Sequence, residues 1–174
     1  MPAILQPSIG CFFNPCMNIA DLISPQRVAH GVRLNSRKRV LELLSKMLVA
    51  DQPQLSEKDV FESLIAREKL GGTGLGRGVA LPHGRLKNST RPLGAFVHLQ
   101  TGIDYDAGDK QPVDLVFALI VPEKSTDEHL EILATLARMF SDKQLREQLR
   151  MADSDAALYD LLRGHLTQPN LHDP

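Results

Sequence analysis

The stretch Arg67–Gly84, REKLGGTGLGRGVALPHG, holds five glycines within the eight positions of Gly71–Gly78. Glycine loses more conformational freedom on folding than any other residue, so this density indicates a backbone that must turn sharply or approach another group closely. A Walker-type phosphate loop would end in Gly-Lys-Ser/Thr, but here Gly76 is followed by Arg and Gly. A dinucleotide fingerprint would follow a strand, and here a helix is expected before the glycines. The stretch therefore matches neither nucleotide-binding motif.

His83 is the residue in this stretch with the clearest chemical potential. It lies between Pro82, which stiffens the backbone, and Gly84, which leaves room beside it. This setting favours an imidazole presented on a loop over one packed in a core. Neutral imidazole is abundant at pH 7 and is a good covalent nucleophile for phosphoryl groups. Taken alone, however, a histidine in a loop is more often inert, and both interpretations stay open at this point.

Other residues near this stretch suit an anionic group. Arg67, at the end of the helix expected before the glycines, has a planar fork for phosphate oxygens, although a solvated arginine is the simpler interpretation. His129 falls in the first turn of a predicted helix, where the helix dipole favours neutral imidazole until an anion arrives. Backbone N–H groups of a glycine-rich loop can also approach an anion. The remaining histidines are expected to be structural or solvated, among them His30, His98, His165 and His172.

Hydrophobic spacing predicts the elements on either side. Apolar residues recur at helical spacing after Ser36 and Ser56, two candidate N-caps. Leu93–Leu99 alternates like a half-buried strand. Val113–Val121 is the most hydrophobic segment, short and rich in β-branched residues, like a central strand covered on both faces. The expected helices are Arg37–Ala50, one from Ser56 to the glycines at 71 and 72, one capped by Thr126 or Asp127, Lys143–Met151 and Ser154–His165. Because helices and strands interleave, the fold class is α/β.

Composition excludes several classes of protein. The chain has 174 residues, a net charge of −1 and an apolar fraction of 43%, which predict a single domain with its own core. Lysine and arginine are spread among acidic residues, so no nucleic-acid partner is expected. The longest apolar run, Leu115–Val121, has seven residues, whereas a membrane span needs about 20. The N-terminus has no basic segment typical of a signal peptide, and the expected location is cytoplasmic.

The two ends of the chain are expected to lie outside the domain. Residues 1–16 contain three prolines and no period, which indicates an irregular extension, and Met17 is an alternative start. Residues 167–174 are expected to form a flexible tail. Cys11 and Cys16 have no further ligands at zinc spacing, so we expect reduced thiols, no metal and no cofactor.

The stretch Arg67–Gly84 resembles the IIA proteins of the bacterial phosphotransferase system, mannitol/fructose type, and most closely their nitrogen-regulatory branch. The resemblance continues through Gln111–Pro122 and the helix that contains His129, and it covers about Met17–Gly164. Two positions depart from the pattern. Gly72 stands where that family often has Ser, and Arg77 stands where Asn or His is common. Neither departure removes a chemical role that the family implies, and Arg77 is expected to alter partner docking.

This resemblance implies a single domain over residues 17–166, with a mixed parallel/antiparallel sheet of about five strands flanked by helices. It implies that His83 is phosphorylated, that Arg67 contacts the phosphate and that His129 is a second active-site histidine. The glycines expected to bind phosphate through their backbone are Gly74, Gly76 and Gly78.

The resemblance also implies partners. The phosphoryl group would come from phosphoenolpyruvate through a relay enzyme and an HPr-like carrier of the nitrogen type, which makes the chain a component of a phosphotransferase. By analogy with the family, the regulated targets are sensor kinases or potassium transport proteins. Two alternatives remain open. One is a sugar-transport IIA component that passes phosphate to a IIB cysteine, and the other is a binding module that is never phosphorylated.

Overall fold

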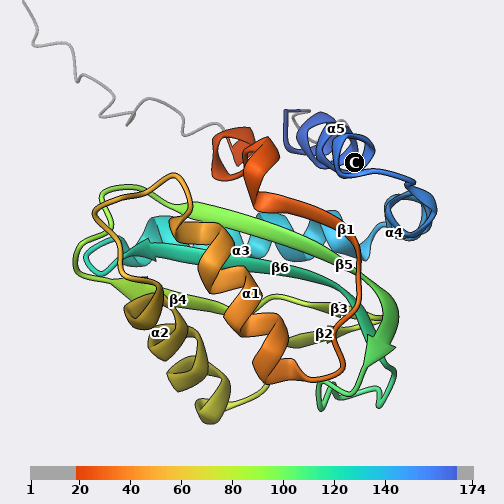
Figure 1. Ribbon diagram of the computed structural model, residues 1–174, viewed down its shortest axis with the longest axis horizontal. Coiled ribbons are helices and arrows are strands. Elements are labelled where there is room, and N and C mark those ends of the chain that lie inside the picture. Colours follow the sequence, from red (N-terminus) through yellow and green to blue (C-terminus); the bar gives the residue numbers. More distant parts are fainter. Residues whose placement is uncertain (1–18, 168–174) are drawn as a thin grey trace, which may run out of the picture.

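A computed structural model describes residues 19–167, so the proposed N-terminal extension, both cysteines and residues 168–174 lie outside the described part. A six-stranded sheet lies at the centre, with helices on both of its faces (Figure 1). The predicted α/β class and the mixed sheet are confirmed, with six strands in place of about five. Three strands that no pattern predicted are β1 (Val28–Val32), β2 (Gly74–Gly76) and β4 (His83–Leu86).

The sheet combines parallel and antiparallel pairs in the order β1-β5-β6-β3-β2, with β4 also paired to β6. β5 (Leu93–Ile103) runs antiparallel to β6 (Val113–Pro122), while β1 is parallel to β5. β3 (Val79–Ala80) and β4 both run parallel to β6, and β2 (Gly74–Gly76) is antiparallel to β3. β6 therefore has β5 along one edge and β3 and then β4 along the other.

The two central strands differ in how well their patterns predicted them. The prediction of a covered central strand over Val113–Val121 is confirmed for β6, which extends one residue further, to Pro122. For β5 the half-buried prediction is wrong, because Leu93–Leu99 is buried on both faces. Ala95 and Val97 pack toward one helical layer, and Phe96 between them packs toward the other. Helices on both faces leave no solvent side for the alternating pattern to mark.

Most helix boundaries follow local signals. The N-caps Ser36 and Ser56 are confirmed, since each side-chain oxygen accepts a hydrogen bond from the backbone N–H three residues later in the chain. Ser125 is the N-cap of the third helix, so the prediction of Thr126 or Asp127 is wrong; a turn in which the Ser125 N–H donates to the Pro122 carbonyl starts the helix earlier. The helices are α1 (Arg37–Val49), α2 (Glu57–Leu70), α3 (Thr126–Ser141), α4 (Lys143–Met151) and α5 (Asp155–Thr167), preceded by the short 3-10 helices η1 (Ile19–Leu22) and η2 (Pro25–Arg27).

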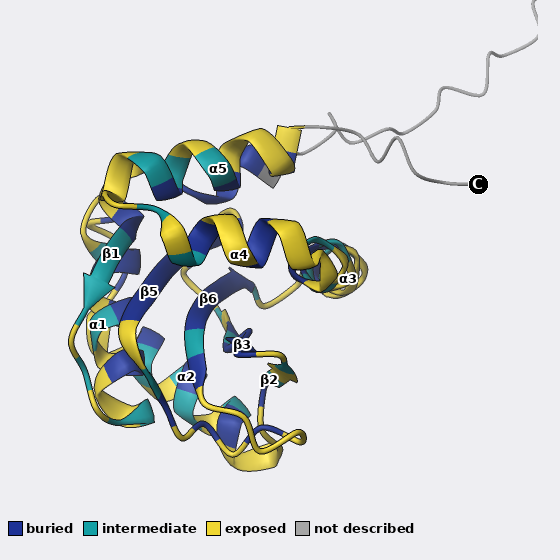
Figure 2. Cartoon of the chain, turned by 90° about the vertical axis from the view of Figure 1, so that its right-hand side faces the viewer, coloured by how far each residue is buried: buried dark blue, intermediate teal, exposed yellow. Residues whose placement is uncertain are grey.

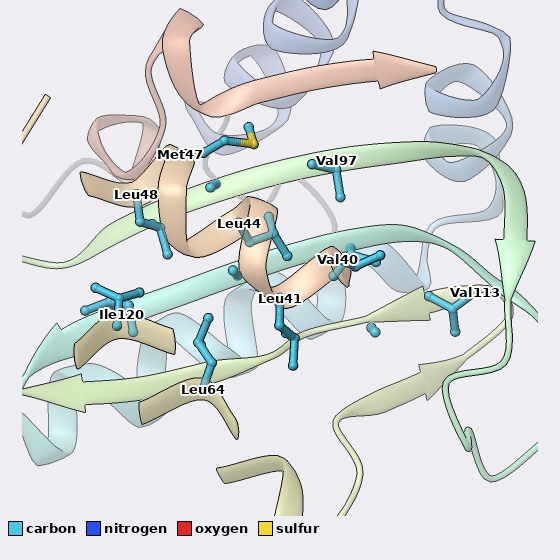
Figure 3. Packing of buried hydrophobic residues seen from close by; sticks show 14 of the residues in the cluster. Val40, Leu41, Leu44, Met47, Leu48, Leu64, Val97, Val113 and Ile120 are labelled. Carbon is cyan, nitrogen blue, oxygen red and sulfur yellow. The ribbon is translucent and has the colours of Figure 1, made fainter. Parts of the chain in front are cut away.

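Two apolar cores result, one on each face of the sheet. Helices α1 and α2 cover one face, where leucines such as Leu44 and Leu64 meet strand residues such as Val97 (Figure 3). Helices α3, α4 and α5 cover the other face, with their buried sides toward the sheet (Figure 2). Buried apolar area is the main stabilising term of folding, so the sheet is held from both sides.

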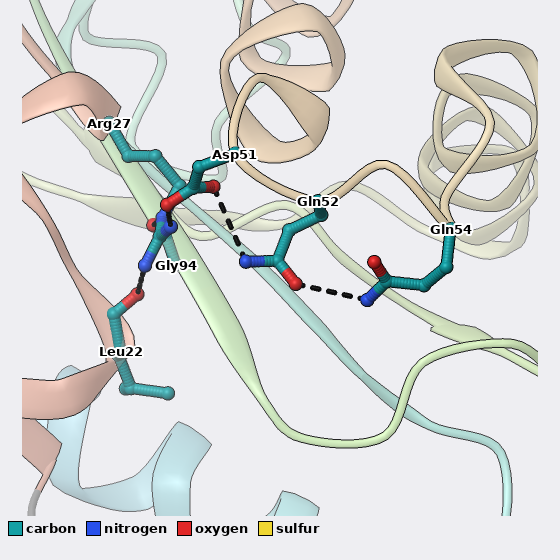
Figure 4. A network of polar contacts seen from close by, with 6 residues as sticks. All are labelled: Leu22, Arg27, Asp51, Gln52, Gln54 and Gly94. Atoms are coloured by element: carbon teal, nitrogen blue, oxygen red, sulfur yellow. Dashed lines mark hydrogen bonds and ion pairs between the residues drawn. The ribbon is translucent and has the colours of Figure 1, made fainter.

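A buried arginine ties the N-terminal part of the described chain to the sheet (Figure 4). Arg27 is 1% exposed, and its guanidinium donates to the carbonyls of Gly94 and Leu22 at 3.0 and 3.1 Å. Its Nη1 forms an ion pair of 2.5 Å with Asp51, just after α1. A buried charge is costly unless it is paired, so this network fixes η1, β5 and the end of α1 relative to one another.

Candidate functional site

The glycine-rich stretch folds as a β-hairpin. β2 pairs with β3, and the turn between them contains three consecutive residues with positive φ, namely Gly76 at 84°, Arg77 at 57° and Gly78 at 81°. A loop across Gly74–Gly76 is therefore a wrong prediction, because these residues pair with β3. A left-handed backbone favours glycine at all three turn positions, and glycine occupies two of them.

The glycines predicted to bind phosphate fit the hairpin against its neighbours. A Cβ on Gly74 would lie 2.9 Å from the Cβ of Ala107, and a Cβ on Gly78 would lie 2.3 Å from Nη2 of Arg150. Arg150 donates to both carboxylate oxygens of Asp114 at 2.9 Å and to the Arg77 carbonyl at 2.8 Å. The close neighbours of Gly74 and Gly78 thus explain why these positions lack a side chain. Contact of Gly74, Gly76 or Gly78 with phosphate stays a prediction.

His83 begins strand β4 and is half-buried, so its predicted place on a presented loop is wrong. The chain follows the edge of β6 from β3 through Pro82, whose carbonyl accepts a hydrogen bond from the Leu119 N–H at 2.9 Å. His83 then pairs with Leu119 in the β4–β6 register. The interruption at Pro82 separates the two short strands and places His83 at the start of the second one.

Gly84 allows helix α2 to pack directly on β4. A Cβ at this position would lie 2.2 Å from Oγ of Ser63, and that hydroxyl donates to the Arg85 carbonyl at 3.0 Å. Residues four apart lie on one face of a helix, so Ser63 and Arg67 share the face of α2 that meets β4. The room that Gly84 provides is therefore taken by Ser63, and this contact brings Arg67 toward His83. The Arg67 guanidinium also donates to the Gly71 carbonyl at 2.8 Å.

The ring of His83 is fixed through one nitrogen. Its Nδ1 lies 2.8 Å from the carbonyl oxygen of Leu81. A carbonyl only accepts, so Nδ1 carries the proton and Nε2 holds the free lone pair in the neutral ring. Burial is the main cause that lowers the pKa of His83, and the Arg67 guanidinium lowers it further, against the opposing effect of the Leu81 hydrogen bond. The ring is therefore neutral at pH 7, with Nε2 as the available nucleophile.

His129 reaches the same site from the first turn of α3. Its ring lies edge-on to that of His83, with 5.3 Å between centroids and an interplanar angle of 77°. His129 is 5% exposed, and burial followed by the nearby His83 and arginines lowers its pKa to about 4. The ring is thus neutral, as predicted, although burial is the largest cause. The structure therefore brings together His83, Arg67 and His129, the three residues that the sequence singled out.

Arg85 is the residue of the site that sequence reasoning did not assign. It follows His83 by two positions on β4, so the two side chains lie on the same side of the strand. Its Nε donates to Nδ1 of His129 at 3.2 Å. A strand period of two would have identified Arg85, but the Pro-His-Gly sequence indicated a loop, where that period does not apply.

This constellation combines a free imidazole lone pair, two guanidinium groups and a second, buried imidazole. Neither Arg67 nor Arg85 forms an ion pair with a carboxylate within residues 19–167. Fixed cations and donors around a nucleophile are what phosphoryl transfer needs, because charge on the phosphoryl oxygens must be stabilised. In the described part of the chain no cluster of three metal-ligating side chains occurs, and no helix there has the length and apolar character to cross a membrane.

Comparisons with known proteins agree with this chemistry. Residues 21–165 match the family described as "Phosphoenolpyruvate-dependent sugar phosphotransferase system, EIIA 2". The chain is 41% identical over 146 residues to a nitrogen regulatory protein of Pseudomonas aeruginosa, which covers 84% of this chain and 95% of the relative. A nitrogen regulatory protein of Escherichia coli is 42% identical over 147 residues, with 84% of this chain and 90% of that protein covered.

Solved structures give the same result at the level of the fold. The nitrogen regulatory protein IIA-Ntr from Neisseria meningitidis superposes with a TM-score of 0.78 at 42% identity, covering 86% of this chain and 99% of that one. The mannitol IIA protein of Escherichia coli superposes with a TM-score of 0.67 at 18% identity, over 80% and 98% of the two chains. The second likeness concerns the fold alone.

Proposed function

Since the chain belongs to the EIIA type-2 family of the phosphoenolpyruvate-dependent sugar phosphotransferase system, we propose that it is a regulatory phosphocarrier of the nitrogen-related branch. His83 accepts a phosphoryl group from the histidine of an HPr-like carrier, and the phosphorylated and unmodified forms act differently on target proteins. The observation that carries this proposal is the orientation of His83, whose Nδ1 is held by the Leu81 carbonyl while Nε2 remains free among cations.

The transfer step follows from this orientation. The lone pair on Nε2 of His83 forms a bond to phosphorus while the bond between phosphorus and the carrier's ring nitrogen breaks in line. When the carrier's other ring nitrogen bears a proton, its ring leaves as neutral imidazole with the bonding electron pair. Positive charge then builds on the ring of His83, where the Leu81 carbonyl accepts from Nδ1–H and stabilises it. No proton has to move during the step.

The surrounding residues have separate roles in this step. Arg67 stabilises the three equatorial phosphoryl oxygens, because its fork is always charged and binds oxygens in pairs. His129 supplies an N–H donor to the same oxygens. The step requires no metal ion and no cofactor of the chain's own, since the leaving group and the nucleophile are both imidazoles.

Partners follow by analogy with the family. The donor is an HPr-like carrier of the nitrogen type, charged by a relay enzyme from phosphoenolpyruvate, and such a relay operates in the cytoplasm. The regulated targets belong to classes such as sensor kinases and potassium transport proteins. The relatives that are about 41–43% identical are nitrogen regulatory proteins, which favours this branch over sugar transport.

The direct test is a reconstituted relay. The purified chain is incubated with phosphoenolpyruvate, the relay enzyme and the HPr-like carrier, and its intact mass is followed over time. We expect stoichiometric uptake of one phosphoryl group that depends on the carrier. No uptake would reject the phosphocarrier and leave a binding module that is never phosphorylated.

A second arm separates the two kinds of phosphocarrier. A purified sugar IIB domain is added to the phosphorylated chain, and transfer to its cysteine is measured. A regulatory phosphocarrier is expected to keep its phosphate in the presence of the IIB domain for much longer than the relay needs to phosphorylate it. Rapid transfer to the IIB cysteine would assign the chain to sugar transport instead.

Regulation is proposed to work as a release switch. Phosphate adds close to two negative charges beside Arg67 and Arg85. A target that docks on this face with an acidic or apolar surface then binds the unmodified form better, because repulsion and desolvation of the phosphate oppose docking. Binding is measured with unmodified protein, phosphorylated protein and the His83→Asp variant. Equal affinity of a target for the first two forms would reject the switch.

A further inference from the structure

Arg85 makes an unusual contact for an arginine. Its Nε donates to a neutral ring nitrogen, Nδ1 of His129, at 3.2 Å, while no carboxylate of the described chain pairs with it. Guanidinium has five donors and no acceptor, and it does not lose its proton in proteins. The nitrogen that faces it must therefore be the unprotonated one, so the proton of the neutral His129 ring resides on Nε2.

The other nitrogen of His129, Nε2, is buried and has no hydrogen-bond partner within residues 19–167. Water is largely excluded as well, because His129 is only 5% exposed. Buried polar groups in proteins are nearly always hydrogen-bonded, so a buried donor left free beside a nucleophile points to a ligand that accepts from it. The edge-on neighbour is His83, whose ring centroid lies 5.3 Å away.

The two alternatives for His129 are both opposed by Arg85. With the proton on Nδ1, two donors would face each other across 3.2 Å, and Nε2 would present a lone pair to the phosphoryl oxygens. With both nitrogens protonated, the ring would be a second cation against the guanidinium. The charged and titratable groups that act on His129 are His83, Arg85 and Arg67, and all three disfavour the protonated ring.

We infer that Arg85 is a positioning residue, which holds His129 as the Nε2–H tautomer so that this N–H is free to donate to a phosphoryl oxygen on its way to His83. The role of this His129 tautomer in phosphoryl transfer rests on the proposed function, whereas the assignment of the proton to Nε2 does not. Arg85 thus acts through His129. Arg67 differs, because within residues 19–167 its guanidinium forms no hydrogen bond with that ring and donates to the Gly71 carbonyl instead.

The tautomer is read directly in the unphosphorylated protein. Two-bond ¹⁵N–¹H correlation spectra of histidine-labelled protein at pH 7 show which nitrogen of His129 is protonated. We expect Nε2–H in the wild type, a mixture containing Nδ1–H in Arg85→Met, and recovery of Nε2–H in Arg85→Lys, since an ammonium group is also a pure donor. Arg163→Met, an equal change on an exposed arginine of α5, is the control and should leave His129 unchanged.

Transfer kinetics test whether the tautomer is used. Loss of one donor to a developing oxyanion slows a reaction by roughly 100-fold, and Arg85→Met should slow transfer by roughly tenfold because part of the rings keep the productive tautomer. In a His129→Ala background, Arg85→Met should have little further effect, because Arg85 then has nothing to position.

Three results would overturn the inference. These are Nδ1–H in the wild type, an unchanged tautomer in Arg85→Met, and a full additional loss from Arg85→Met in the His129→Ala background, which would make Arg85 a direct phosphate ligand. A wild-type chain that takes up no phosphate would reject the proposed function, and the spectra would still decide whether Arg85 sets the tautomer.

Discussion

Within residues 19–167 two pairs of histidine rings lie against each other, and the groups around the two pairs differ. His83 and His129 meet edge-on, whereas His30 on β1 and His98 on β5 are stacked with 5.6 Å between centroids and an interplanar angle of 30°. Each pair includes one buried ring nitrogen without a hydrogen bond in the described structure, on His129 and on His98. Burial lowers the pKa of both of these rings.

The two histidine pairs differ in whether the arginines near them are paired with carboxylates. Near His98 the arginine is Arg150, which is already held by both carboxylate oxygens of Asp114. Near His83 and His129 the guanidinium groups are Arg67 and Arg85, which have no carboxylate partner in residues 19–167. An unpaired buried nitrogen is thus not sufficient to mark a phosphate site. The proposed phosphate site is distinguished by a set of cations that are not neutralised, together with a ring whose tautomer is fixed.

The largest expected effect is the loss of phosphorylation in a variant of His83, compared with a variant of His98 in the other pair. His83→Ala should abolish phosphorylation by the carrier, because no other histidine ring in residues 19–167 holds an unprotonated Nε2 beside unpaired cations, while His98→Ala should keep it. Acid-labile phosphate, measured by intact mass before and after brief acid treatment, is the readout. Wild-type labelling of the His83→Ala protein, or loss of labelling in His98→Ala, would break the contrast between the pairs.

The second prediction concerns the partner ring of His83. His129→Ala should still accept phosphate, but roughly 100-fold more slowly, because it removes a donor to the phosphoryl oxygens and keeps the nucleophile. Single-turnover transfer from the phosphorylated carrier measures this rate. A complete absence of transfer would mean that His129 itself takes part in carrying phosphate.

The third prediction is a dependence of stability on pH. The pKa of His129 is about 4 in the folded protein, below the ordinary value of 6.5, so the unfolded chain binds this proton first as the pH falls. The stabilisation is fully present above pH 6.5 and is lost toward pH 4, which amounts to roughly 2 kcal/mol between pH 7 and 4.5. Urea unfolding of wild type and His129→Gln at both pH values should show a smaller loss in the variant. Equal losses in the two proteins would show that His129 is charged or exposed when folded.

The smallest effects are expected when lysine replaces Arg67, which has no carboxylate partner in residues 19–167, or Arg150, which is paired with Asp114. Arg67→Lys should slow transfer by roughly tenfold and leave the free energy of unfolding within about 0.5 kcal/mol, because lysine keeps the charge and loses the fork. Arg150→Lys should do the reverse, costing roughly 1 kcal/mol of stability through its bidentate pair with Asp114 while transfer stays unchanged. If both changes affected the same property, the contrast between free and neutralised arginines would be wrong.

Local signals predicted the parts of the fold that depend on nearby residues. Ser36 and Ser56 cap their helices as expected, and the hydrophobic segment Val113–Val121 lies in the central strand. Strand β4 was missed because Pro-His-Gly has the composition of a turn, and its pairing with β6 joins residues about 36 positions apart, such as His83 and Leu119. Pairing over such a separation leaves no mark in a local pattern.

The candidate site shows the same division. His83, Arg67 and His129 were selected through a family resemblance, and residue type alone left each with a simpler interpretation. The burial of His129 depends on how α3 packs beside β4, and the role of Gly84 depends on Ser63, which lies on another element. Arg85 was not assigned because its meaning comes from a single contact with a residue 44 positions away.

The central claim is that His83 carries the phosphoryl group on Nε2, because the Leu81 carbonyl occupies Nδ1. The most direct measurement is NMR of the chain phosphorylated by the HPr-like carrier, with ³¹P and ¹⁵N labels read at the same ring. We expect one phosphohistidine signal, coupled to Nε2 of His83, with Nδ1 still protonated. Phosphate on Nδ1, on another side chain, or nowhere on the chain would contradict the account.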